Sequence, residues 1–141
     1  MAGREDAVKL YIIEKALATF GDGSVSRLVQ DREGMELYCY LPPRMHNLEA
    51  MAYLQQTFPS DAFDDADVLS SVYVGYDRIH NAGPRDEQMH RVTFTGSLTE
   101  MADNAERIDR DGFAAAQKSQ RAMQILRREK ELERKGRDFT Q

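Results

Sequence analysis

Hydrophobic residues in the first part of the chain recur at helical spacing. Over residues 5–20 they form a broad apolar stripe, made of Val8, Leu10, Tyr11, Ile12, Ile13, Ala16, Leu17 and Phe20. A stripe of this width predicts a helix that is buried on most of its surface. Gly21 follows directly, and glycine often stands just after the end of a helix, so we expect the helix to stop there.

The residues that follow alternate between apolar and polar positions, which predicts a β-hairpin. Asp22-Gly23 is a turn sequence, residues 24–30 predict a strand, and residues 31–34 predict a tight loop. In the next strand one set of positions is apolar and the other is polar or aromatic: Met35, Leu37, Cys39 and Leu41 alternate with Glu36, Tyr38 and Tyr40. One face of this strand is therefore expected to be core and the other to be partly aromatic.

A second helix and a second hairpin are predicted for the middle of the chain. Asn47 is a candidate N-cap for a crossover helix over residues 47–58. Residues 68–77 and 89–96 each alternate apolar and polar positions, which predicts two further strands. The polar residues 78–87 are expected to join these strands.

The last third of the sequence predicts one long helix over residues 97–135. Ser97 and Glu100 fit a capping box at its start. A stripe of mostly small residues keeps its phase through Gly112 and consists of Leu98, Met101, Ala105, Ile108, Gly112, Ala115, Ser119, Ala122 and Leu126. Such a stripe favours close packing against another helix or a sheet.

The length of this helix depends on two further expectations. The alternative to one helix is a break near Ile108, followed by a new helix with Asp111 as its N-cap. After Leu126 the stripe is continued by Glu129 and Glu133, so packing is expected to stop at Leu126. The final basic turns are then expected to extend into solvent.

Together these elements predict one α+β domain with two layers. It has an antiparallel sheet of about four strands in two hairpins, an N-terminal helix, a crossover helix and a long C-terminal helix. We expect the domain to span residues 1–128 and a charged helical extension and tail to span residues 129–141. The element order, size and acidity over residues 5–126 resemble those of small acidic, dimeric chaperones of the type III secretion class and related adaptor folds. This resemblance implies binding to another protein, and it involves no motif residue, so it supplies no site.

Charge is divided between an acidic body and a basic C-terminal end. The net charge of the chain is −5. Residues 117–141 contain eight basic and four acidic side chains, a net of +4, which leaves −9 for residues 1–116. An acidic body repels phosphates, so direct nucleic-acid binding is not expected. The acidic side chains between the basic ones predict a solvated helix face at the C-terminal end.

The sequence also predicts where in the cell the protein is located. The first residues lack an apolar stretch behind a basic start, and no run approaches the length of a membrane span. We therefore expect a cytoplasmic protein with no membrane partner. Cys39 is the only cysteine, which excludes an intrachain disulfide, and its inward strand position predicts that it packs as a small hydrophobic residue.

Motifs for metal, cofactor or nucleophile chemistry are absent from the sequence. His46, His80 and His90 form no short metal-ligand pair, and the acidic residues 61–67 lack the glycine of a calcium loop. The densest set of groups that can bind an anion or transfer a proton lies in residues 77–86 and consists of Asp77, Arg78, His80, Asn81 and Arg85. We expect no catalytic residue, metal or cofactor, and this loop is the one candidate ligand site.

These observations favour a non-enzymatic protein-binding adaptor or chaperone-like module that forms a homodimer. The residues expected to bind protein are strand tyrosines and basic residues of the last helix, namely Tyr38, Tyr40, Tyr73, Arg121, Arg127 and Arg128. One alternative is an acidic inhibitor of a nucleic-acid enzyme, in which carboxylates imitate phosphates; the candidates are Asp61, Asp64, Asp65 and Asp67. The other alternative is a small enzyme or ligand-binding domain that uses residues 77–86.

Overall fold

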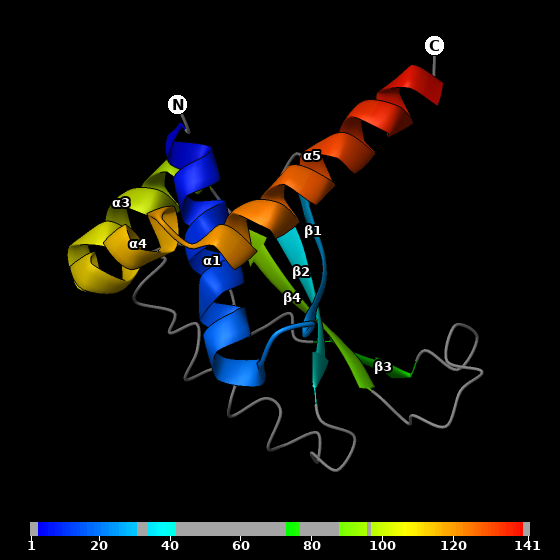
Figure 1. The fold of residues 1–141 in the computed structure, drawn as a ribbon, viewed down its shortest axis with the longest axis horizontal. Coiled ribbons are helices and arrows are strands. Elements are labelled where there is room, and N and C mark those ends of the chain that lie inside the picture. Colours follow the sequence, from blue (N-terminus) through cyan, green and yellow to red (C-terminus); the bar gives the residue numbers. More distant parts are fainter. Residues whose placement is uncertain (1–2, 31–33, 42–72, 77–87, 96, 140–141) are drawn as a thin grey trace.

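The computed structural model describes residues 3–30, 34–41, 73–76, 88–95 and 97–139. Within these ranges helices are combined with an antiparallel sheet, which confirms the mixed helix-and-strand class (Figure 1). The elements are α1 (Arg4–Phe20), β1 (Val25–Gln30), β2 (Gly34–Leu41), β3 (Tyr73–Tyr76), β4 (Gln88–Thr95), α3 (Leu98–Ile108), α4 (Arg110–Gln117) and α5 (Gln120–Phe139). The predicted crossover helix and the loop over residues 78–87 lie outside the described residues.

Helix α1 confirms the prediction for residues 5–20. All but one of the predicted stripe residues are buried, and Phe20 packs against the core while partly exposed. Glu5 and Asp6 lie in the first turn, where negative charge is stabilised by the helix dipole. The helix ends at Gly21, which has a φ of +102° and whose N–H donates to the Leu17 carbonyl at 2.9 Å. Glycine is favoured there because other residues rarely adopt this backbone conformation.

The sheet places β1 at one edge. Its strand order is β1-β2-β4-β3, and each neighbouring pair is antiparallel. The predicted hairpin of residues 24–41 is present as β1 and β2, and the inward side chains of Met35, Leu37 and Cys39 are buried as expected. The second edge of β1 has no strand partner among the described residues, and α5 contacts β1.

Helix α1 is the central element of the described fold. It contacts α3, α4 and α5 as well as β1 and β2, and Figure 1 shows α3 and α4 on one side of it and the sheet on the other. The largest fully buried side chains come from helices and strands alike: Val8, Ile12, Ile13, Met35, Leu37, Phe94 and Met101. One hydrophobic cluster therefore joins α1 to the sheet and to the C-terminal helices.

The prediction of one helix over residues 97–135 is wrong, because the chain forms three helices there. Helix α3 ends and α4 begins at Asp109, and a short joint separates α4 from α5. The predicted start is confirmed, since Ser97 Oγ accepts a hydrogen bond from the Glu100 N–H at 3.3 Å. The alternative placed the break in the correct region, but Asp109 rather than Asp111 caps the second helix.

The predicted stripe of small residues also changes its course at the break. Ile108 is 44% exposed and Ala115 is exposed, whereas Phe113 and Ala116 are buried. A change of chain direction at Asp109 gives α4 its own inward face, so the spacing of the stripe no longer decides which residues are buried. The continuous phase across the break was a coincidence of sequence spacing.

Candidate functional site

The loop predicted as a ligand site lies outside the described residues, together with its candidate side chains Asp77, Arg78, His80, Asn81 and Arg85. The acidic residues 61–67 lie outside them as well. In the part of the chain that the structure describes, no group of three or more histidine, cysteine, aspartate or glutamate side chains is placed to hold a metal ion. The enzyme and inhibitor alternatives therefore rest on the sequence alone.

Strand register aligns two of the three predicted tyrosines in one row of the sheet. Tyr38 of β2 pairs with Arg91 of β4, which in turn pairs with Tyr73 of β3. Tyr38 is half-buried, and its hydroxyl donates to Glu36 Oε2 at 2.5 Å. Tyr40 is two residues further along β2, so its Cα belongs to the same face of the sheet. The backbone therefore groups the three tyrosine positions that were predicted to bind protein.

The joint between α3 and α4 is built around the Asp109 carboxylate. Its Oδ1 accepts a hydrogen bond from the Gly112 N–H at 3.2 Å, which caps α4. Its Oδ2 accepts the Tyr11 hydroxyl at 3.0 Å and lies 3.1 Å from Lys15 Nζ. A Cβ at Gly112 would lie 2.3 Å from Asp109 Oδ2, so the carboxylate occupies the space that a side chain would need. Burial opposes ionisation, but the hydrogen bonds from Lys15 and Tyr11 outweigh it and hold the pKa of Asp109 below its ordinary value.

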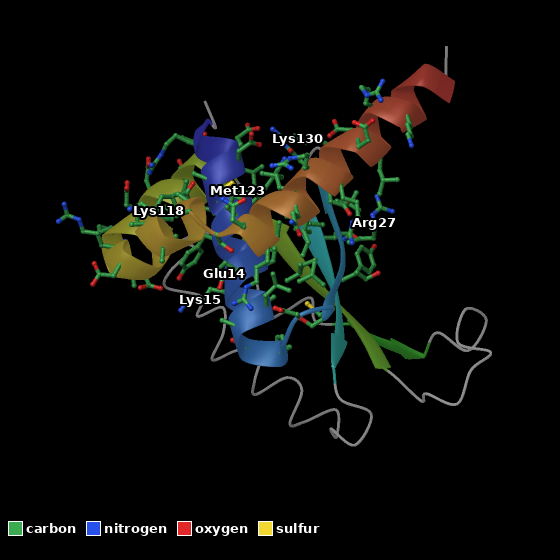
Figure 2. All side chains as sticks on the ribbon, in the orientation of Figure 1. Glu14, Lys15, Arg27, Lys118, Met123 and Lys130 are labelled. Carbon is green, nitrogen blue, oxygen red and sulfur yellow. The ribbon has the colours of Figure 1, made fainter. Side chains whose placement is uncertain are left out.

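The joint between α4 and α5 is held by Glu14 of α1. Ser119 Oγ donates to Glu14 Oε1 at 2.5 Å and accepts a backbone N–H from the first turn of α5 at 3.2 Å. Arg121 donates to both Glu14 oxygens, at 2.9 and 2.5 Å, and its Nη1 lies 2.6 Å from Asp22 Oδ1. The hydrogen bonds from Arg121 hold the pKa of the Glu14 carboxyl below its ordinary value. Two consecutive residues of α1, Glu14 and Lys15, thus fix the two helix joints (Figure 2).

Packing of α5 continues beyond Leu126, so the expectation that it stops there is wrong. Glu129 is only 8% exposed, and its two carboxylate oxygens accept hydrogen bonds from Arg27 Nε at 2.9 and 3.0 Å. Arg128 Nη2 donates to the Ser26 carbonyl at 2.6 Å. The register of β1 with β2 shifts at Ser26, and an extra residue of this kind redirects backbone groups from the regular ladder. The helix is therefore attached to the edge strand at Ser26, where the strand is irregular, and at Arg27, the residue that follows.

Most basic side chains on the first half of α5 already have partners within the chain. Arg121 and Arg128 form the contacts described above, and Lys130 Nζ forms an ion pair with Asp6 of α1. Arg127 is different, because it is exposed and no carboxylate among the described residues lies at ion-pair distance from it. Of the three arginines that were predicted to bind protein, Arg127 is the one whose guanidinium has no assigned role in the fold.

Beyond Lys130, α5 leaves the body of the fold. Residues 131–136 are all exposed, and Figure 1 shows this end of the helix projecting past the sheet. A groove lies between this part of α5 and β1, and Val29, Leu132, Lys9 and Glu133 are among the residues that line it. We call it the β1–α5 groove. Val29 is 37% exposed and Leu132 is 41% exposed, so large apolar side chains on both walls are in contact with solvent.

A second open surface, which we call the α1–α5 hollow, lies where α5 meets α1 and α4. It has a volume of about 590 Å³ and is lined by Asp6, Leu10, Gln117, Met123, Leu126, Arg127 and Lys130. Leu10 and Leu126 are buried, and Met123 is partly buried against the core. Apolar side chains therefore form part of the lining, and Arg127 and Lys130 add positive charge to it.

No protein-family model matches the sequence, and neither a curated protein nor a solved structure is similar enough to match it. Among the described helices, none is both long and apolar enough to cross a membrane.

Sequence reasoning missed Val29, Glu129 and Leu132. A signal for Leu132 is its spacing of seven residues from Ile125, which places both side chains on one helix face. No local signal identifies Glu129, because its burial depends on Arg27, which is 102 residues away in the sequence. An isolated glutamate after an apolar stripe predicts solvent exposure unless the cation that neutralises it is known.

Proposed function

We propose that this chain is a non-enzymatic protein-binding module, of the adaptor or chaperone-like kind, that forms a homodimer through the β1–α5 groove. The observation that carries this proposal is the pair of exposed apolar side chains, Val29 and Leu132, on opposite walls of one groove. Full burial of such side chains contributes about 1.5–3 kcal/mol each, which favours association with a second surface. The projecting end of α5 supplies a helix face that its own body does not cover.

A second copy fits this groove because each copy contributes the same two elements. In a two-fold dimer, α5 of one copy lies against β1 of the other, and the same contacts are made twice. Such an arrangement buries Leu132 and Val29 in both copies. The other protein that an adaptor requires is then proposed to bind at Tyr38, Tyr40 and Tyr73 of the sheet.

We also propose that the protein acts in the cytoplasm. Cys39 is a free, buried thiol, and burial raises the pKa of that thiol to about 12. A protonated thiol inside the core packs as a small apolar group and needs no disulfide partner.

The test is the molar mass in sedimentation equilibrium over a wide concentration range. We expect a dimer for the native sequence and a monomer for Leu132→Glu, since a buried carboxylate without a partner opposes association. Ile108→Glu is the matched control, because Ile108 is 44% exposed and lies in α3, away from the groove. A native sequence that is monomeric at all concentrations, or equal effects of the two substitutions, would contradict the proposal.

A further inference from the structure

The α1–α5 hollow has the features of a docking site for a second kind of partner. Ligand sites in proteins typically enclose about 300–1,000 Å³ and combine apolar walls with a few placed polar groups. The hollow, with about 590 Å³, is lined by the apolar side chains of Leu10, Met123 and Leu126. In the view of Figure 2, Met123 lies between Lys118 of the α4–α5 joint and Lys130.

The charges around the hollow are unbalanced. Lys130 is neutralised by Asp6, which lines the hollow beside it. Arg127 lines the hollow without an ion-pair partner among the described residues. One positive charge of the lining therefore has no counterpart within the described ranges, and a planar guanidinium is best matched by a carboxylate that accepts two of its hydrogen bonds.

The elements around the hollow also indicate the form of the ligand. Among the described residues, its lining comes from α1, α4 and α5 and includes no strand residue that could pair with an extended peptide. Recognition must then use side chains, as when an amphipathic helix places residues at i, i+3, i+4 and i+7 into a groove. The lining is partly apolar and includes the Asp6 carboxylate, which repels phosphate, so a nucleic acid is disfavoured.

We propose that the α1–α5 hollow binds a helical segment of a partner protein in which a carboxylate stands beside large apolar residues. The apolar side chains pack on Leu10, Met123 and Leu126, and the carboxylate accepts hydrogen bonds from Arg127. The hollow shares Leu126 and Lys130 with the β1–α5 groove, but Leu132 lines only the groove, so a Leu132→Glu chain that fails to dimerise still has the hollow.

The probe is a short acetylated peptide with leucine at i, i+3, i+4 and i+7 and glutamate at the positions beside them. Its two sister peptides carry glutamine or lysine in place of glutamate. Fluorescence anisotropy measures the binding of each peptide to the full chain. We expect the glutamate peptide to bind at least about tenfold more tightly than the glutamine peptide, because a hydrogen bond between two charged groups is stronger than one to a neutral amide.

Charge reversal at Arg127 gives the decisive variant. Arg127→Glu should lower the affinity for the glutamate peptide at least about tenfold and make the lysine peptide the preferred ligand. Arg110→Glu is the matched control, because Arg110 is also an exposed arginine but does not line the hollow. This control should leave the order of the three peptides unchanged.

The methyl NMR signal of Met123 reports where the peptide binds. The signal is assigned from its loss in Met123→Leu, and it should shift when the glutamate peptide is added. Failure of all three peptides to bind would overturn the proposal, and so would equal affinity for them or an Arg127→Glu result that matches Arg110→Glu. Preferential binding to vesicles of phosphatidylserine and phosphatidylcholine, abolished by Arg127→Glu, would also overturn it and assign the hollow to a lipid surface.

Discussion

The two halves of α5 carry similar residues in different surroundings. In the first half, Arg121, Glu129 and Lys130 each form an ion pair with α1 or β1. In the second half, residues 131–136 are exposed, and Glu131 and Arg134 form an ion pair with each other, one turn apart. The charge pattern of the sequence does not distinguish a helix segment that is part of the fold from one that is open to a partner. The two are distinguished by whether opposite charges on other elements lie close to the helix.

The largest expected difference between the halves comes from the same substitution at two leucines. Leu126→Ala should cost about 2–5 kcal/mol of unfolding free energy, because Leu126 is 7% exposed and its removal leaves a cavity. Leu132→Ala should cost less than about 1 kcal/mol at concentrations where the protein is monomeric, because Leu132 is 41% exposed. Urea unfolding at low protein concentration measures both, and equal losses would remove the distinction between the halves.

Two glycines give the next largest contrast, with opposite signs. Gly112→Ala should destabilise by about 1–2 kcal/mol, since the new Cβ displaces the Asp109 carboxylate from the α4 N-terminus and from Tyr11. Gly136→Ala should stabilise by about 0.5–1 kcal/mol, because a Cβ there meets nothing within 4 Å and alanine favours helix. Thermal unfolding of both variants checks the signs. A stabilised Gly112→Ala protein would show that Asp109 does not hold the joint as described.

A smaller effect concerns pH. The pKa values of Glu14 and Asp109 are lowered in the folded protein, so each carboxylate stabilises the fold above its unfolded pKa, about 4. This contribution is lost as the pH falls through the lower folded pKa values. Glu14→Gln should therefore reduce stability at neutral pH and flatten its decline in acid. Glu133→Gln is the control, because Glu133 is exposed and forms no ion pair among the described residues. Equal pH profiles for the two variants would argue against the Glu14 anchor.

Local patterns predicted α1 and the β1–β2 hairpin because their signals are strong and short in range. The stripe of α1 ends at a glycine, and the alternation in β2 has one apolar face. The one-helix prediction missed the break at Asp109 because a main contact of Asp109 is remote: Tyr11 lies 98 residues away in the sequence. The α5 surface could not be predicted for the same reason: Glu129 is buried because Arg27 pairs with it, and Arg127 has no ion-pair partner in the described part of the chain. The burial of Glu129 and the exposure of Arg127 depend on which elements pack together, and the spacing of residues along one helix does not give that information.

Amide hydrogen exchange of the unmodified protein, followed at several protein concentrations, tests the contrast within α5 most directly. Amides in residues 120–130 should exchange slowly at every concentration, because side chains attach this segment to α1 and β1. Amides in residues 131–136 should exchange rapidly in dilute solution and become protected, together with those of residues 28–30, as the dimer forms. Rapid exchange along the whole of α5, or protection of residues 131–136 that does not depend on concentration, would contradict this account.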